Sequence, residues 1–169
     1  HVGEIVIRGH NTMAGYLNDE KATAEAFAGG WLHSGDLGYR DEEGFFFIVD
    51  RKKELIIRGG YNVYPREVEE VLYQHPAVFE AAVVGVPNER LGEEVAAYVS
   101  LKAGQVAGEQ QLIDFVKERV AAYKFPRTVV IVDDLPKSAT GKILKLQLLE
   151  NFPPAGNAPS RKNPSPTPS

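Results

Sequence analysis

Alternating strand and helix patterns between Leu55 and Leu149 constrain the fold more than any other feature of this 169-residue chain. Short apolar runs with a period of two predict strands, and apolar residues spaced three or four apart predict helices. The order is strand, helix, strand, strand, helix, strand, helix, with elements at 55–57, from Pro65, and at 78–86, 95–102, 110–122, 128–132 and 143–149. We expect a small α+β domain in which helices flank a mixed or antiparallel sheet.

The first 50 residues have a different texture, in which short strands alternate with turns. As a strand, the segment GEIVIRG places Glu4, Val6 and Arg8 on one face and Ile5 and Ile7 on the other, and FFFIVD is predicted to be a further strand. Asn18 or Asp19 is placed to cap a short helix between them. We interpret residues 1–50 as the β-rich end of a larger N-terminal domain, and the chain, which does not begin with Met, as a piece of a longer protein.

A dense charge run, DRKKE, interrupts the apolar pattern after residue 49. Such a break is typical of a domain boundary, and we expect a hinge at residues 51–53. A second domain then covers residues 54–150. From residue 151 onward the sequence is rich in Pro and Ser and has no apolar periodicity, which predicts a disordered tail over 151–169.

Composition and charge argue against several classes of function. The net charge is −4 and no long Lys/Arg cluster is present, so nucleic acid is not expected as a partner. The chain has no cysteine, and its histidines show no ligand spacing, so no metal site is predicted in it. The apolar runs are strand-sized, far below the about 20 residues of a transmembrane segment. With no signal peptide at its start, the sequence fits a cytoplasmic protein.

The segment PKSATGKILK, residues 136–145, places Lys142 at the tip of a Gly-containing loop beside a short helix. A phosphate-binding P-loop needs glycine at position 136 and Ser or Thr after the lysine, but Pro136 and Ile143 stand there. An isolated Gly-Lys pair is typical of a turn glycine followed by a solvated lysine. The other motifs upstream in the sequence are what favour an anion-binding lysine instead.

Two upstream segments contain further candidate binding residues. HSGDLGYRDEEG contains Asp36 in a Ser-Gly-Asp turn, where an ionised carboxylate can accept two hydrogen bonds from a vicinal diol. The simpler interpretation is an Asx-turn that caps its own backbone. DRKKELIIRGGYNVYPREVEE contains Arg51, Lys53, Gly59 and Gly60, for which the simpler interpretations are solvated surface charges and a tight turn.

Together and in this order, the three segments resemble the C-terminal half of the adenylate-forming enzymes: acyl-CoA synthetases, luciferases and peptide-synthetase adenylation domains. GEIVIRGHNTMAGYLNDEKAT matches the segment that precedes them in the family, so the resemblance covers roughly residues 3–150. The hinge and lysine segments are more similar to fatty-acid-type acyl-CoA synthetases than to peptide-synthetase domains. The resemblance implies that residues 54–150 form the small C-terminal lid domain of such an enzyme.

The resemblance also implies a role for each candidate residue. Asp36 and Arg51 bind the ribose of ATP and of the acyl-adenylate. Lys142 is the catalytic residue of adenylation, which reaches the carboxylate substrate and the α-phosphate. Lys53 is the hinge about which the lid rotates between two half-reactions, and Gly59–Gly60 line the tunnel for the pantetheine arm of coenzyme A.

The implied reaction joins a carboxylic acid, expected to be a fatty acid, to coenzyme A, with ATP converted to AMP and pyrophosphate. The phosphate loop, the acyl pocket and the Mg²⁺ ligands are expected in a missing N-terminal domain, so the isolated chain should be inactive in the full reaction. Two alternatives stay open. In the first, the chain belongs to an adenylation domain that loads a carrier-protein thiol. In the second, it is a non-catalytic lid that binds only a nucleotide or a partner.

Overall fold

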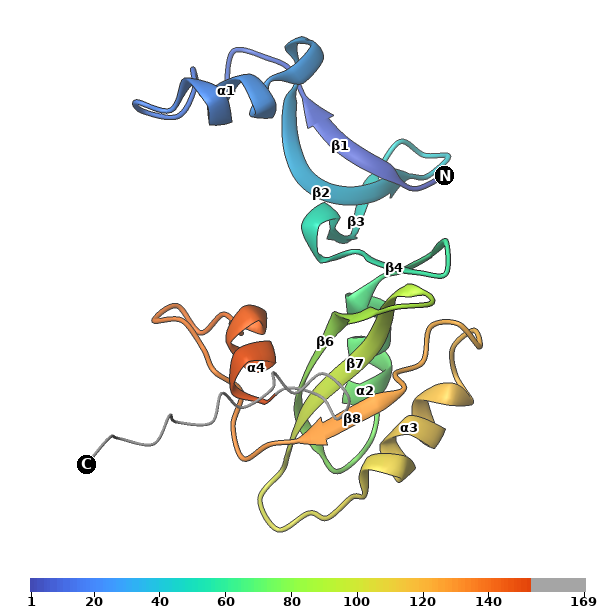
Figure 1. Cartoon of the computed structure of the whole chain (residues 1–169). Helices are drawn as coiled ribbons and strands as arrows, with labels where there is room; N and C mark the ends of the chain where they lie inside the picture. The colour runs from blue at the N-terminus through green and yellow to red at the C-terminus, as the bar shows by residue number, and fades with distance from the viewer. Residues whose placement is uncertain (153–169) are drawn as a thin grey trace, which may run out of the picture. The chain divides into compact units, whose positions relative to one another are not determined.

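The computed structural model describes residues 1–152. Its contacts divide the chain into two compact units (Figure 1). Unit 1 comprises His1–Leu55 and Tyr64–Glu67, and unit 2 comprises Ile56–Val63 and the chain from Val68 onward. The predicted tail lies outside the described residues except for its first two positions, where helix α4 extends to Asn151.

Unit 1 is built on a three-stranded antiparallel sheet, which confirms the predicted β-rich character of this part of the chain. The strands are β1 (Gly3–Ile7), β2 (Leu32–Arg40) and β3 (Phe46–Arg51), in the order β1-β2-β3. Helix α1 (Glu20–Ala26) and the 3₁₀ turn η1 (Ala28–Gly30) connect β1 to β2. The cap of α1 is Asp19, whose carboxylate accepts the Ala22 N–H at 2.9 Å.

Strand β2 departs from regular pairing where it carries the Ser-Gly-Asp sequence. One residue of β1, Ile5, lies opposite residues 34–36 of β2. Gly35 has φ of +73°, a left-handed conformation that glycine adopts without strain. The Ser34 hydroxyl donates to the Ile5 carbonyl at 2.7 Å and accepts the Asp36 N–H at 3.0 Å. Asp36 therefore lies at the end of a β-bulge within a strand and not in the predicted turn, because both flanks of the bulge stay paired.

Unit 2 contains a mixed five-stranded sheet within the described residues, as the predicted α+β fold requires. The order β5-β4-β7-β6 is antiparallel, and β8 pairs with β7 in parallel. The bounds are β4 (Ile56–Arg58), β5 (Tyr61–Val63), β6 (Val78–Asn88), β7 (Gly92–Leu101) and β8 (Thr128–Ile131). The longest pairing joins β7, the central strand, to β6 at the edge of the sheet.

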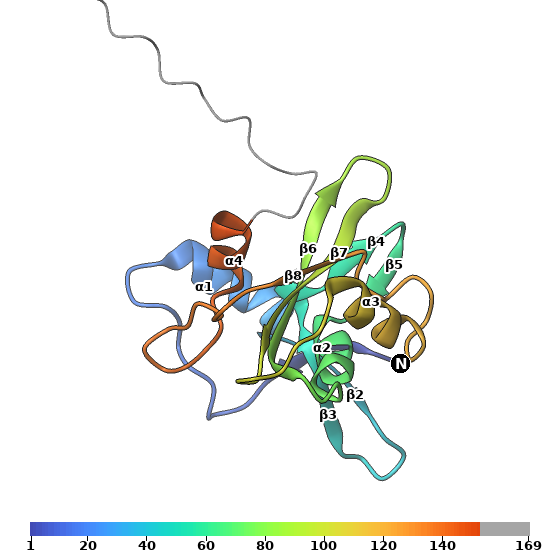
Figure 2. The ribbon, with the colours of Figure 1, turned by 90° about the horizontal axis from the view of Figure 1, so that it is seen from below.

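Helices cover both faces of this sheet (Figure 2). Helices α2 (Pro65–Tyr73) and α3 (Glu109–Lys117) pack on one face, where Leu72 and Leu112 are completely buried. Helix α4 (Lys145–Asn151) packs on the other face, where Leu148 belongs to the same buried cluster as Tyr98 of β7. Because both faces are covered, the central strands are apolar on both sides and read as nearly continuous hydrophobic runs.

The largest differences from the sequence-based prediction concern one helix, one strand and one loop. The helix predicted over 110–122 ends at Lys117, and Val120 packs against the core from an irregular turn in which its N–H still donates to the Val116 carbonyl. Strand β5 was not predicted, because its three residues are too few to show a hydrophobic period. The loop expected over PNERLGE shrinks to residues 89–91, because Asn88 pairs with Gly92 and the latter takes φ of +78°.

Docking of helix α4 predicts a contrast between two leucines on that helix. Leu148 is 0% exposed, whereas Leu146 is 77% exposed. We expect Leu148→Ala to lower the free energy of unfolding by about 2–5 kcal/mol, because it leaves a cavity beneath the helix. Leu146→Ala is the matched control and should change it by less than about 0.5 kcal/mol. Urea denaturation measures both, and equal effects would contradict the docking of α4.

Candidate functional site

The two predicted nucleotide-binding residues meet on neighbouring strands of unit 1. Asp36 of β2 is the pairing partner of Arg51 at the end of β3. Nε of Arg51 lies 2.8 Å from Oδ1 of Asp36, and the side chains are 49% and 28% exposed. The pair therefore remains accessible to a ligand. A carboxylate beside a guanidinium offers acceptors and fixed donors, which suits a molecule that carries hydroxyl groups next to a phosphate.

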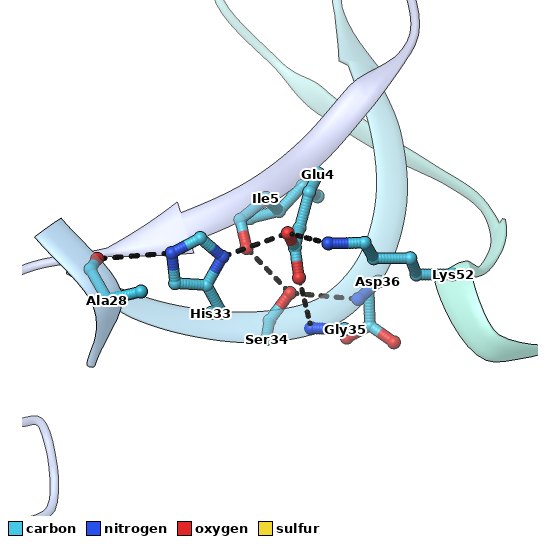
Figure 3. A network of polar contacts seen from close by, with 8 residues as sticks. All are labelled: Glu4, Ile5, Ala28, His33, Ser34, Gly35, Asp36 and Lys52. Carbon is cyan, nitrogen blue, oxygen red and sulfur yellow. Dashed lines mark hydrogen bonds and ion pairs between the residues drawn. The ribbon is translucent and has the colours of Figure 1, made fainter. Parts of the chain in front are cut away.

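Behind this pair, Glu4 of β1 is the centre of a polar network (Figure 3). One carboxylate oxygen of Glu4 accepts hydrogen bonds from Nζ of Lys52 at 2.8 Å and from Nδ1 of His33 at 2.9 Å. The other oxygen accepts the Gly35 N–H at 3.3 Å. Nε2 of His33 donates to the Ala28 carbonyl at 3.2 Å. The strand pattern of GEIVIRG places Glu4 on a strand face but gives no sign of this network.

The hydrogen-bond partners of His33 and Glu4 determine the charge of both side chains. Both ring nitrogens of His33 face oxygen atoms that only accept, so the imidazolium alone makes both bonds. The Glu4 carboxylate, and then the Ala28 carbonyl, raise the pKa of His33 above its ordinary value. The hydrogen bond from Lys52, followed by that from His33, holds the pKa of Glu4 below its ordinary value.

The predicted catalytic lysine lies on a loop of unit 2 that is closed by its own backbone. At the base, the Leu144 N–H donates to the Pro136 carbonyl at 2.8 Å. The Ser138 N–H donates to the Lys142 carbonyl at 2.8 Å, and the Ser138 hydroxyl accepts the Lys142 N–H at 3.2 Å. Gly141 takes φ of +80° and completes the reversal. The loop thus has a defined shape without help from the Lys142 side chain.

Two other lysines of the same segment anchor this loop. Nζ of Lys137 lies 2.7 Å from the Glu80 carboxylate of β6, and Nζ of Lys145 lies 2.9 Å from that of Glu69 on α2. Lys142 is exposed, and within residues 1–152 no carboxylate pairs with its ammonium. Of three lysines in one short segment, two stabilise the loop and the third is available to an anion.

Gly59 and Gly60 form the turn between β4 and β5, with φ of +57° and +83°. The turn is attached to the sheet on its β4 side. The Gly59 N–H donates to the Leu91 carbonyl at 2.8 Å, and the Arg58 guanidinium makes a two-bonded ion pair with Glu94 of β7. These contacts fix the position of the glycine turn, and its tip exposes backbone without side chains.

The predicted site residues are divided between the units. Lys53 lies in the 3₁₀ turn η2 (Lys52–Glu54), next to Leu55, where the first segment of unit 1 ends. A hinge there stays a prediction. Unit 1 carries Asp36 and Arg51, and unit 2 carries Gly59, Gly60 and Lys142.

The described part of the chain offers little to a metal ion. Among residues 1–152, no three His, Asp or Glu side chains form a group that could hold a metal. In the same residues, no helix is both long enough and apolar enough to span a membrane.

Comparisons with known proteins agree with this arrangement. Residues 67–142 match the AMP-binding enzyme C-terminal domain. The chain is 52% identical over 148 residues to a long-chain-fatty-acid–CoA ligase of Bacillus subtilis (strain 168), a match that covers 88% of this chain and 26% of the relative. It is 50% identical over 146 residues to a 2-succinylbenzoate–CoA ligase of Bacillus mycoides (strain KBAB4), which covers 86% and 30%.

A solved structure shows the same fold. The o-succinylbenzoate CoA synthetase MenE of Bacillus subtilis, in complex with its acyl-adenylate intermediate, superposes with a TM-score of 0.80 at 45% identity over 88% of this chain and 30% of that one. Most of the described part of unit 2 thus matches the AMP-binding enzyme C-terminal domain. The chain belongs to the adenylate-forming enzymes and corresponds to their C-terminal portion, as its motifs predicted, and it spans 26% and 30% of the two curated relatives.

The Glu4 network predicts a characteristic dependence of stability on pH. Glu4 stabilises the fold above its ordinary pKa of 4.5, and this contribution is lost as pH falls through the lowered folded value. His33 stabilises it below its ordinary pKa of 6.5, and this contribution is lost as pH rises through the raised folded value. We therefore expect the loss of unfolding free energy in Glu4→Gln to be largest between pH 4.5 and 6.5 and smaller at pH 8.5.

Urea denaturation at several pH values measures this difference. The control is Glu43→Gln, because Glu43 is exposed in the β2–β3 turn and its substitution changes the net charge equally. A loss in Glu4→Gln that does not vary between pH 5.5 and 8.5 would show that His33 is not part of the network.

Proposed function

We propose that this chain supplies the lid and part of the nucleotide site of an AMP-forming acid–thiol ligase, which activates a carboxylic acid with ATP and transfers it to coenzyme A. The anchored loop that presents Lys142, within a match to the AMP-binding enzyme C-terminal domain, is the observation that carries the proposal. The remaining parts of the site, with the Mg²⁺ ligands, lie outside the described residues. ATP and coenzyme A are cytoplasmic metabolites, which favours that compartment.

In the first half-reaction, a carboxylate oxygen attacks the α-phosphorus of ATP, the bond to the β-phosphate bridging oxygen breaks, and pyrophosphate leaves. Two anions must approach each other, and the Lys142 ammonium reduces their repulsion and stabilises charge on the phosphoryl oxygens. The Asp36 carboxylate accepts hydrogen bonds from the ribose hydroxyls, while Arg51 holds that carboxylate at 2.8 Å and donates toward the nucleotide.

In the second half-reaction, the coenzyme A thiolate attacks the acyl carbon, the bond from that carbon to the phosphate oxygen breaks, and AMP leaves. We assign Gly59 and Gly60 to the passage of the pantetheine arm, because their turn exposes backbone without side chains. The change between half-reactions is assigned to rotation about residues 51–53, with Lys53 as the hinge. The boundary between the units at Leu55 lies two residues away and supports this assignment.

The acid is proposed to be a fatty acid, because a relative at 52% identity is named for long-chain fatty acids. 2-Succinylbenzoate is the competing candidate, since the relative named for it is 50% identical. In the enzyme that contains this chain, we expect acid-dependent ATP–pyrophosphate exchange with a long-chain fatty acid and acyl-CoA formation. A preference for 2-succinylbenzoate would correct the acid, and exchange without any acyl-CoA would favour loading of a carrier-protein thiol.

The role of Lys142 predicts an effect on only one half-reaction. In the enzyme that contains this chain, we expect Lys142→Ala to slow adenylation by roughly 10²–10³-fold, the size of losing one preorganised donor to a developing charge. Thioester formation from supplied acyl-adenylate should keep its rate. Lys21→Ala, at an exposed lysine of α1, is the control and should change neither rate. Equal loss in both half-reactions would remove Lys142 from the adenylation step.

A further inference from the structure

We propose that Glu4 is a positioning residue, which sets the spacing of Asp36 and Arg51 and thereby the affinity for the ribose of the nucleotide. This inference rests on the proposed function, since it takes that pair as ribose ligands. Glu4 binds the residue before one of them and the residue after the other. It accepts the Gly35 N–H at 3.3 Å and the Lys52 ammonium at 2.8 Å.

The Asp36 side of the pair needs such support because its backbone is irregular. Within the bulge, residues 34–36 face a single residue of β1, so on that side no ladder pairing holds Asp36, which is paired only with Arg51 of β3. Gly35 has no side chain and takes φ of +73°, so the bulge is intrinsically adaptable. The Ser34 hydroxyl secures one side of the bulge, and the Glu4 carboxylate secures the Gly35 N–H.

The Arg51 side needs support for a different reason. Arg51 is the last residue of β3, and the chain leaves the sheet directly after it into η2. The residue that follows, Lys52, is tied to Glu4 by its ammonium group. One carboxylate thus joins the bulge in β2 to the start of η2, and the distance between Asp36 and Arg51 depends on it (Figure 3).

Removal of the Glu4 charge should affect both sides together. The Glu4 side chain is only 15% exposed and lies between two cations, Lys52 and protonated His33. A neutral side chain there leaves the Lys52 ammonium without its counter-charge and removes the carboxylate that favours protonated His33. Lys52 and the Gly35 N–H then lose the carboxylate that joins them, so η2 and the bulge of β2 are no longer held together and the Asp36–Arg51 pair is disturbed. Glu4 itself has no hydrogen bond to Asp36 or Arg51 among the described residues.

The test is nucleotide affinity in the enzyme that contains this chain, measured by calorimetry with AMP and by exchange kinetics with ATP. We expect Glu4→Gln to raise the Kd for AMP and the KM for ATP roughly tenfold, the size of losing a hydrogen bond to a charged group. The kcat of exchange should change less than twofold, because the reacting phosphorus is remote from the ribose. Glu4→Asp, which retains the charge, should recover part of the affinity, and Glu43→Gln should behave like the wild type.

A double-mutant cycle separates positioning from general destabilisation. If Glu4 acts through Asp36, Glu4→Gln should weaken AMP binding little further in an Asp36→Asn background. Additive losses, an unchanged Kd in Glu4→Gln, or a fall in kcat at constant Kd would each overturn the proposal. An enzyme that binds AMP with this Glu4 dependence but exchanges pyrophosphate with no acid would refute the proposed function and leave the role of Glu4 intact.

Discussion

The antiparallel pairing of β6 and β7 is the constraint on which unit 2 depends. The paired strands run from Val78 to Leu101 and are buried on both faces. Consecutive residues such as Ala82 and Val83 belong to different core clusters, so α2 and α3 pack on one side and α4 on the other. A strand with a polar face would bury only one layer of helices. The second layer also bears on the Lys142 loop. This loop connects β8 to α4, so the packing of α4 on the sheet fixes the position of one of its two ends.

Carboxylates organise the cations of this chain in two ways. Glu80 and Glu69 each bind a lysine beside the Lys142 loop and so fix its base. Glu4 gathers Lys52 and His33 and supports the Asp36–Arg51 pair from behind. In both places the groups proposed to meet the ligand are more exposed than the carboxylates that support them. This division is what preorganised electrostatics requires, because the supporting charges do not have to move when a ligand arrives.

Sequence reasoning predicted those features that depend on residues close together in the chain. Period-two and helical spacing indicated the α+β order, and the PKSATGKILK motif indicated Lys142 and its loop. The bulge at Asp36 and the Glu4 network were not predicted, because they arise where β1 and β2 meet: Glu4 and His33 are 29 positions apart. A charged residue inside an otherwise apolar strand was the available signal, but alternation alone explains it equally well. Whether Glu4 joins a polar network or only points to solvent depends on the register between β1 and β2, which periodicity does not specify.

A buried hydroxyl gives the end of α4 a mechanical role. Tyr98, at the centre of β7 and 0% exposed, donates from its hydroxyl to the carbonyl of Phe152 at 2.7 Å. The last described turn of the chain is therefore attached to the middle strand of the sheet as well as packed against it through Leu148. A pulling force applied at Phe152 is therefore transmitted to a strand that has paired neighbours on both sides. The end of α4 is thus bound to the central strand of unit 2 and not only to the helix layer above it.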